Sequence, residues 1–252
     1  MNIKAVVSDI DGTLVQYCPD LSGLDEADAL IAASTIDAIS RLHQNGLIVA
    51  GVTGRTYEQS RDVLTRLGIT GPCVFAGGAT IRDLPSGEIL YEASLAPHTL
   101  IAVKAILLEI LGDDYPLDIA PSAKDPNSYN SVWAIVERTK IAIIAEQLAA
   151  LNDIYHVVND GAGKQDEVGL LVLQAGVDKG SATKRLLSLL ALEKTEVACI
   201  GDGANDVLMF EQCGVTFAMG NGEQSLKDQA NYIVSDIDKD GFAEAVDIIL
   251  RL

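Results

Sequence analysis

Short apolar runs that end in small or acidic residues recur along the first third of the chain. The runs near residues 5–7, 47–52 and 73–76 predict buried strands. Between them, Ile36, Ile39 and Leu42 share one face of a helix capped by Ser34 or Thr35, and residues 57–67 form a second helix that stops at Gly68. Alternating strands and helices predict a parallel sheet with right-handed crossovers.

The pattern changes after residue 79. Residues 80–83 and 88–92, separated by a Pro- and Gly-containing turn, predict a β-hairpin. Beyond it the sequence predicts, in order, a helix, a strand, a second helix and two more strands, at residues 100–111, 131–137, 141–151, 154–158 and 167–173. This block, residues 93–177, is therefore expected to form a compact α/β unit of its own.

The first pattern returns at residue 178. A helix is predicted from Lys179 to Leu192, followed by a strand around Cys199 and a helix after Asp206. Short strands at 215–218 and 232–234 and helices at 223–229 and 242–250 complete the chain. We expect an α/β fold: a doubly wound, Rossmann-like parallel sheet built from residues 1–92 and 178–252, with the α/β unit of residues 93–177 inserted.

Composition limits the partners of this fold. The 252 residues carry a formal net charge of -18, which argues against binding to nucleic acid or to an anionic membrane surface. The four cysteines lack a CxxC spacing, so we expect buried free thiols and no zinc site. The absence of a leader-like or membrane-spanning stretch predicts a soluble cytoplasmic protein. The cysteines are Cys18, Cys73, Cys199 and Cys213.

The first predicted strand ends in two carboxylates. Asp9 and Asp11 are followed by Gly12, at the edge of the sheet where open α/β folds bind ligands. Two like charges this close favour a divalent cation such as Mg²⁺ between them. A solvated Asp-Gly turn is the simpler alternative for this stretch alone.

Three further stretches supply complementary chemistry. The strand around Cys199 runs into Asp202, Asn205 and Asp206, and the strand before Thr53 runs into Gly54 and Arg55. Lys179 lies at a predicted helix start. Carboxylates suit a cation, whereas hydroxyl, amide, Lys and Arg groups suit a phosphoryl group.

These stretches, Asp9–Thr13, Thr53–Arg55, Lys179–Gly180 and Gly201–Asp206, resemble in order the four motifs of the haloacid dehalogenase superfamily. Their form is most similar to the Cof-type phosphatases, which carry a large α/β cap between the second and third motifs. The resemblance covers nearly the whole chain. It implies that residues 93–177 are this cap and that the active site lies in the crevice between cap and core.

The resemblance also implies roles. Asp9 is expected to be the nucleophile that forms an aspartyl-phosphate, and Asp11 the general acid and then base. Mg²⁺ would be held by Asp9, by the backbone carbonyl of Asp11 and by Asp202, with Asp206 contacting the metal or orienting Asp202. The phosphoryl group and substrate are expected to contact Gly12, Thr53, Gly54, Arg55, Lys179 and Asn205.

Several assignments stay open. Arg55 could contact substrate or pair with nearby acids. The acidic segment of residues 14–33 is explained better by a solvated loop than by a lid. Polar and aromatic groups in the predicted cap could recognise a leaving group, although packing explains each more simply; they are Asn127, Tyr129, Asn130, Trp133, His156 and Lys164.

The expected function is Mg²⁺-dependent hydrolysis of a small phosphomonoester, a sugar phosphate or related metabolite. Two alternatives remain. The same core and cap type occur in hexose phosphomutases, and a non-enzymatic metal- or phosphate-binding regulator could use the same scaffold. The sequence does not identify the metabolite or the oligomeric state.

Overall fold

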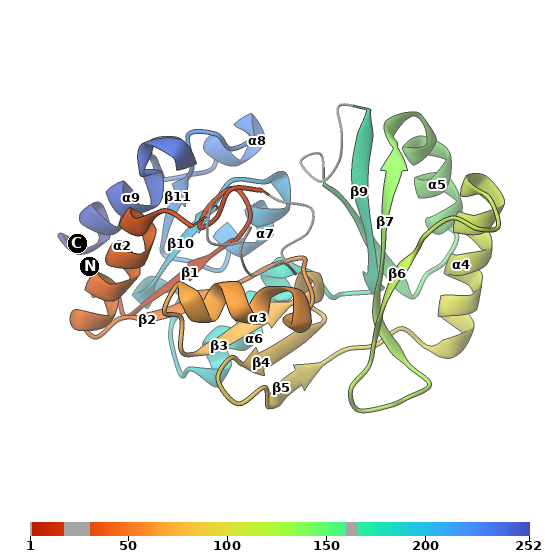
Figure 1. Ribbon diagram of the computed structural model, residues 1–252, viewed down its shortest axis with the longest axis horizontal. Coiled ribbons are helices and arrows are strands. Elements are labelled where there is room, and N and C mark those ends of the chain that lie inside the picture. The colour runs from red at the N-terminus through yellow and green to blue at the C-terminus, as the bar shows by residue number, and fades with distance from the viewer. Residues whose placement is uncertain (1, 18–30, 160–165) are drawn as a thin grey trace.

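The computed structural model describes residues 2–17, 31–159 and 166–252. Its centre is a five-stranded parallel sheet of order β12-β11-β10-β1-β2 (Figure 1). The strands, in that order, span Tyr232–Ile233, Val215–Ala218, Val197–Gly201, Ala5–Ser8 and Ile48–Gly51. The predicted doubly wound parallel sheet is confirmed.

Register aligns the carboxyl ends of the central strands. β1 pairs in parallel with β10 and with β2, so that Ser8 lies opposite both Ile200 and Gly51. All four residues of β1 are buried, which explains the apolar run of its first three residues, Ala5–Val7. The residues that follow the three strands therefore emerge at one edge of the sheet, where the acidic stretches predicted to bind ligand meet.

Helices cover both faces of this sheet. Helices α2, α3 and α9 pack against one face through side chains such as Ile39, Leu64 and Phe242, while α6, α7 and α8 pack against the other. In chain order these helices span Ala33–Gln44, Tyr57–Arg66, Lys179–Leu189, Val207–Phe210, Gln224–Lys227 and Gly241–Ile249. The N-cap of α2 is Ala32, without a side-chain cap, so the prediction of Ser34 or Thr35 was wrong by two or three residues.

A three-stranded sheet extends the core. It consists of β3 (Pro72–Phe75), β4 (Thr80–Asp83) and β5 (Ile89–Glu92), and the β4–β5 pairing confirms the predicted hairpin. A single parallel bridge between Val52 and Val74 connects β3 to the end of β2. The strands of this sheet lead the chain from the parallel sheet towards the inserted unit.

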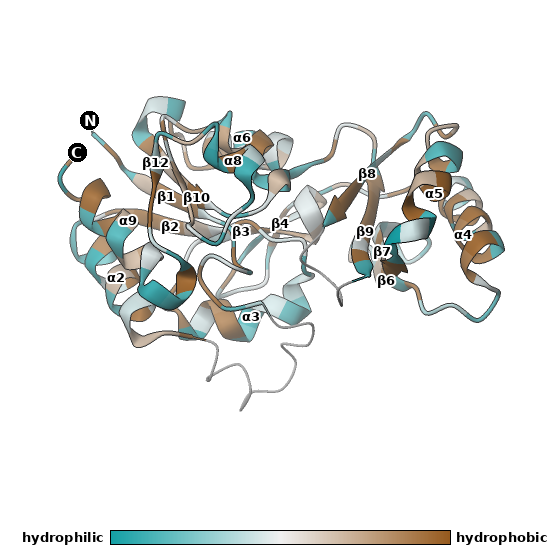
Figure 2. Ribbon diagram, turned by 90° about the horizontal axis from the view of Figure 1, so that it is seen from above, coloured by the Kyte–Doolittle hydropathy of each residue, from teal (hydrophilic) through white to brown (hydrophobic). Residues whose placement is uncertain are grey.

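The inserted unit is a four-stranded antiparallel sheet with two helices on one face. Its strand order is β6-β7-β9-β8, and α4 and α5 lie on the side facing away from the parallel sheet (Figures 1 and 2). The elements α4, β6, β7, α5, β8 and β9 span Pro97–Leu111, Asp118–Pro121, Tyr129–Glu137, Ile141–Leu148, Ile154–Asn159 and Glu167–Gln174. The inserted α/β cap is thereby confirmed, although β6 was not predicted; the boundaries at residues 93 and 177 stay a prediction.

The cysteines depart from the sequence-based expectation. Cys199 on β10 and Cys213 after α7 form a disulfide, with Cα atoms 5.8 Å apart, so the prediction of free thiols is wrong for this pair. Their separation of 14 residues gave no sign of it, because α7 folds the chain back against β10. Cys73 is a buried free thiol, as expected.

Three expectations concern residues outside the described part of the chain. Cys18, Lys164 and most of the acidic segment 14–33 fall there.

Within the described residues, no helix combines the length and apolar character needed to cross a membrane.

Candidate active site

The loop after β1 places the first acidic pair. The backbone N–H of Asp9 donates to the Ile200 carbonyl at 2.9 Å, which fixes the loop against β10. Gly12 has φ +78°, and a Cβ at this position would lie 2.1 Å from Oδ2 of Asp202. Glycine is required here both by the left-handed backbone and by the close approach of the two loops.

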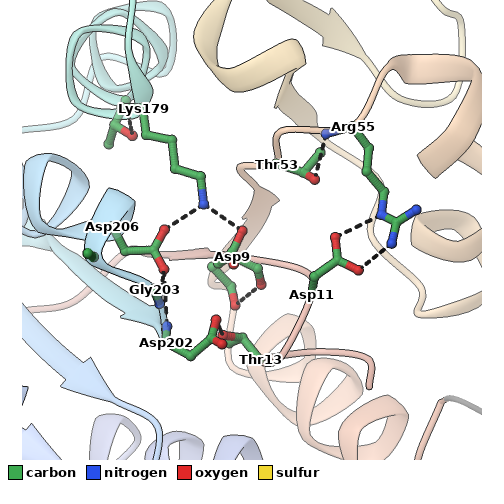
Figure 3. A network of polar contacts seen from close by, with 12 residues as sticks. Asp9, Asp11, Thr13, Thr53, Arg55, Lys179, Asp202, Gly203 and Asp206 are labelled. Carbon is green, nitrogen blue, oxygen red and sulfur yellow. Dashed lines mark hydrogen bonds and ion pairs between the residues drawn. The ribbon is translucent and has the colours of Figure 1, made fainter. Parts of the chain in front are cut away.

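Lys179 connects three segments that are distant in sequence. It begins α6, after the N-cap Asp178, and its side chain is 6% exposed. Its Nζ donates to Oδ1 of Asp9 at 2.8 Å and to Oδ1 of Asp206 at 2.6 Å (Figure 3). Burial disfavours the ammonium charge, but Asp206 and Asp9 together raise the pKa of Lys179 above its ordinary value. The lysine is therefore a fixed positive charge between two carboxylates.

Asp206 is fully buried, and both of its oxygens have partners. While Oδ1 accepts from Lys179, Oδ2 accepts from the backbone N–H groups of Asp202 and Gly203, each at 3.0 Å. These contacts hold the loop after β10 in place. Asp202 itself accepts a hydrogen bond from the Thr13 hydroxyl at 3.1 Å, which orients its carboxylate towards the β1 loop.

Three carboxylates converge beside this single lysine. One oxygen from each of Asp9, Asp202 and Asp206 lies within 4.8 Å of the others. Burial and the charge of Asp206 raise the pKa of Asp9 well above its ordinary 3.8, against the effect of Lys179. The same two causes raise the pKa of Asp202 to about 7. An excess of desolvated negative charge with only oxygen donors suits a hard divalent cation.

Arg55 belongs to the opposite side of the site. Its Nε and Nη2 donate to the two carboxylate oxygens of Asp11 at 2.8 and 2.7 Å, forming a bidentate pair (Figure 3). Thr53 is buried, and its hydroxyl accepts from the Arg55 N–H at 3.1 Å. Of the two roles left open for Arg55, the pairing with a nearby acid is the one observed. In this arrangement the Asp11 carboxylate faces Arg55, away from the three-carboxylate cluster.

A cavity of about 320 Å³ lies between the carboxyl edge of the parallel sheet and the antiparallel sheet. Of the predicted site residues, only Asp206 is absent from its lining, since that side chain lies beneath the surface of the site. The structure thus brings together Asp9, Asp11, Gly12, Thr53, Gly54, Arg55, Lys179, Asn205 and Asp202 on the cavity wall.

Sequence reasoning missed much of the remaining wall. Tyr17, Thr56 and Gln59 come from the core, and β6 to β9 contribute eight more residues. Trp133, for which core packing was the simpler explanation, lines the cavity. The alternation of Ser131, Trp133 and Ile135 with buried apolar residues was the signal that could have found this face.

The other described polar candidates in the antiparallel unit do not line the cavity. Asn130 is buried and donates to Glu92 at 3.1 Å, and the backbone N–H of Asn127 donates to Asp125 at 2.9 Å. Tyr129 forms a β-bridge with Leu95, and His156 is half-buried on β8. For these four residues a local structural role, as expected, describes what is observed.

Comparison with known proteins agrees with this arrangement. The model of the haloacid dehalogenase-like hydrolases matches residues 6–113 and 112–246. Phosphoglycolate phosphatase 1 of Saccharolobus solfataricus is 29% identical over 254 residues, covering 99% of this chain and 96% of the relative. The 5-amino-6-(5-phospho-D-ribitylamino)uracil phosphatase YwtE of Bacillus subtilis is 24% identical over 299 residues, covering 98% of each protein.

A solved structure gives the same result for the fold. A haloacid dehalogenase-like hydrolase from Bacteroides thetaiotaomicron superimposes with a TM-score of 0.77 at 22% identity. The superposition covers 98% of this chain and 99% of that one. Both the core and the inserted unit therefore have counterparts in it.

Proposed function

Because this chain belongs to the haloacid dehalogenase-like hydrolases and is a phosphoric monoester hydrolase, we propose that it hydrolyses a small phosphomonoester with Mg²⁺ through an aspartyl-phosphate. The observation that carries the proposal is the position of Lys179 between Asp9 and Asp206, next to Asp202 and on the wall of the cavity. A sugar phosphate remains one candidate substrate. The two relatives are named for chemically different esters, so their names do not fix it.

Charge neutralisation supports Asp9 as the nucleophile. An incoming phosphate dianion would be repelled by Asp9 alone, and Lys179 at 2.8 Å offsets that repulsion. One oxygen of Asp9 would attack phosphorus while the bond from phosphorus to the alcohol oxygen breaks. The departing alkoxide takes a proton from Asp11. Water then attacks the aspartyl-phosphate, Asp11 accepts its proton, and inorganic phosphate leaves with Asp9 regenerated.

The Arg55–Asp11 pair adds a condition to this sequence. Both Asp11 oxygens accept hydrogen bonds from Arg55, so the Asp11 carboxylate must leave this pair to reach the leaving group. We propose that the phosphate draws Arg55 away from Asp11, because a doubly charged phosphate is a stronger bidentate partner than a carboxylate. Arg55 would then contact substrate, and Thr53 would hold a phosphoryl oxygen.

The donor set fits Mg²⁺, which prefers oxygen ligands. Asp9, Asp202 and the backbone carbonyl of Asp11 would hold the ion, which when bound neutralises charge on the phosphoryl oxygens. Asp206 would orient Asp202 rather than bind the metal, since both of its oxygens are already occupied and it is fully buried. Asn205 and Gly12, at the cavity wall, would complete the phosphate site with Gly54.

The test is phosphate release from a panel of sugar phosphates and other metabolite esters, with Mg²⁺ or with chelator. Wild type and Asp9→Asn are compared at equal concentration, with circular dichroism as the control for folding. Release that requires both Mg²⁺ and Asp9 supports the proposal. Full turnover by folded Asp9→Asn contradicts the covalent mechanism.

The same panel separates the two alternatives. An isomerised sugar phosphate without free phosphate would identify a phosphomutase. Absence of any reaction, combined with measurable Mg²⁺ binding, would identify a non-enzymatic regulator.

A further inference from the structure

One face of the antiparallel sheet is turned towards the core, where part of it packs against core residues and part of it borders the active-site cavity. Along β7, Ser131, Trp133 and Ile135 line the cavity, while the alternate residues point to the opposite face and pack under α4 and α5. The face towards the site is therefore not part of the hydrophobic core of the inserted unit. We call it the roof of the cavity.

Strand register places one row of the roof in line. Asp118 pairs with Trp133, Trp133 with Leu171, and Leu171 with Val157, so these four side chains are neighbours across β6, β7, β9 and β8. All four line the cavity. The row has a carboxylate at one end, an indole beside it and two aliphatic groups beyond.

The row is held against the core at a defined point. A Cβ on Gly77 would lie 2.4 Å from a methyl carbon of Leu171, so the absence of a side chain there lets the roof approach closely. On the other side, Nε2 of Gln59 donates to Oδ2 of Asp118 at 3.3 Å. Trp133 lies between these two contacts.

Positive charge is confined to the floor of the cavity. Among its lining residues that the structure describes, the cationic ones are Lys179 and Arg55, and each is paired with core carboxylates. The described part of the roof contributes Asp118 but no lysine, arginine or histidine. A second anionic group on the substrate would thus lie beside Asp118, and the described residues of the roof supply no cation to balance it.

We propose that the preferred substrate is the monoester of a planar aromatic or heteroaromatic alcohol whose outer edge is neutral or carries a hydrogen-bond donor. This inference rests on the proposed phosphatase function. A flat ring can stack on the half-buried Trp133, and its donor can reach Asp118, which as a carboxylate only accepts hydrogen bonds. A hexose would instead place some hydroxyls against Leu171 and Val157, which offer no hydrogen-bonding partner, and would have to direct the others to Ser131, Asn159 or Asp118.

Four synthetic esters of primary alcohols test the proposal with similar leaving groups. They are benzyl, cyclohexylmethyl, 4-(aminomethyl)benzyl and 4-carboxybenzyl phosphate, measured as kcat/KM with Mg²⁺ beside glucose 6-phosphate. We expect benzyl to exceed cyclohexylmethyl phosphate by about fivefold, from ring stacking. The aminomethyl ester should exceed the carboxy ester by about tenfold or more, from the charge of Asp118.

Variants at two roof residues, Trp133 and Asp118, show which side chain causes each preference. Trp133→Leu should abolish the preference for benzyl over cyclohexylmethyl phosphate, mainly by lowering kcat/KM for the benzyl ester. Asp118→Lys should reverse the preference between the aminomethyl and carboxy esters, and Asp118→Asn should remove it. Glu146→Gln is the matched control, because Glu146 is an exposed carboxylate on α5, on the covered side of the sheet.

A binding measurement tests the roof without altering it. Trp133 is the sole tryptophan of the chain, so its fluorescence reports directly on a ring placed against it. In Asp9→Asn, saturating benzyl phosphate should change Trp133 emission, whereas cyclohexylmethyl phosphate should change it less. Calorimetry confirms that each ester is bound.

The outcomes separate this inference from the function on which it rests. If no ester of this set or of the metabolite panel is hydrolysed, the proposed function itself fails. If only metabolite esters are hydrolysed, the proposed function stands and the inference is overturned. If glucose 6-phosphate or the carboxy ester is hydrolysed at least as well as the benzyl and aminomethyl esters, the phosphatase stands and the inference is overturned. Bound benzyl phosphate without a change in Trp133 emission also overturns it.

Discussion

The two sheets that enclose the cavity use their residues in opposite ways. The parallel sheet is covered on both faces, and its polar groups appear where β1, β2 and β10 end. The antiparallel sheet is covered by helices on one face, whereas its other face packs partly against the core and partly borders the cavity. Reactive groups thus come from loop residues at a strand edge, whereas the roof is built from alternate residues within strands.

Because of this difference, the residues proposed to react with the phosphate are distinct from those proposed to select the leaving group. The carboxylates and Lys179 hold one another in place through short contacts, so a change in any of them disturbs the others. Roof residues such as Trp133 and Val157 contact the cavity without belonging to that network. A roof residue can therefore change with little effect on the reacting groups, and four predictions test how far this separation extends.

The largest effect is expected at Lys179. Lys179→Met leaves Asp9 and Asp206 as buried carboxylates without a cation, which should lower the free energy of unfolding by about 3–5 kcal/mol. Activity should fall by about 1,000-fold, because the phosphate would meet Asp9 uncompensated. Urea unfolding with and without Mg²⁺ measures the first effect. Lys184→Met, an exposed lysine on the same helix, is the control, and equal losses in the two variants would contradict the assignment.

A large but different effect is expected in the hydrophobic core of the cap. Ile144 on α5 is fully buried, and Ile144→Ala should cost about 2–5 kcal/mol of stability. Thermal unfolding measures this loss of stability, with the fluorescence of Trp133, which lies in the antiparallel sheet, as the signal. Ile143→Ala removes the same atoms from a side chain that is 47% exposed and should change stability little. Similar losses in both variants would refute the comparison.

A glycine pair isolates the contact between the β1 and β10 loops. Gly12 and Gly46 both have φ +78°, but only at Gly12 does a new Cβ meet another group, Asp202 at 2.1 Å. Each alanine substitution should cost about 1–2 kcal/mol of backbone strain. Gly12→Ala should in addition lower kcat by about 100-fold by displacing Asp202. Steady-state kinetics and thermal unfolding separate the two effects, and full activity of Gly12→Ala would contradict the requirement for glycine.

The smallest effect is expected where the two regions join, at Glu92. Burial opposes its charge, but hydrogen bonds from Asn130, Ser122 and the backbone of Ala123 and Lys124 lower the pKa of Glu92 below its ordinary 4.5. Because the folded-state pKa is lowered, the stabilisation is present above the unfolded value and is lost as pH falls through the folded one.

Glu92→Gln should therefore be less stable than wild type by less than about 1 kcal/mol at pH 7, with the difference shrinking as the pH falls below the ordinary pKa of 4.5. Melting temperatures of both proteins across this pH range measure the effect. A difference that stays constant with pH would exclude an ionic contribution of Glu92.

Much of the fold could be predicted because its signals are local. Apolar runs and helical spacing located nearly every element, and small residues after the strands marked the loops of the site. β6 was missed because Asp118–Pro121 is short, contains a proline and alternates weakly, so only its pairing with β7 makes it a strand. The Cys199–Cys213 disulfide was missed for a related reason, since the path of the chain through α7 decides it.

The sequence by itself determined the chemical content of this protein: which strands end in carboxylates, where a lysine begins a helix, and which family the motifs belong to. Those properties follow from short-range spacing. Tertiary structure decided that Lys179 lies between Asp9 and Asp206, that Arg55 pairs with Asp11, and that Trp133 faces the cavity. Each depends on strand register and on how one sheet is placed over the other. Both are set by packing between residues that are far apart in the chain.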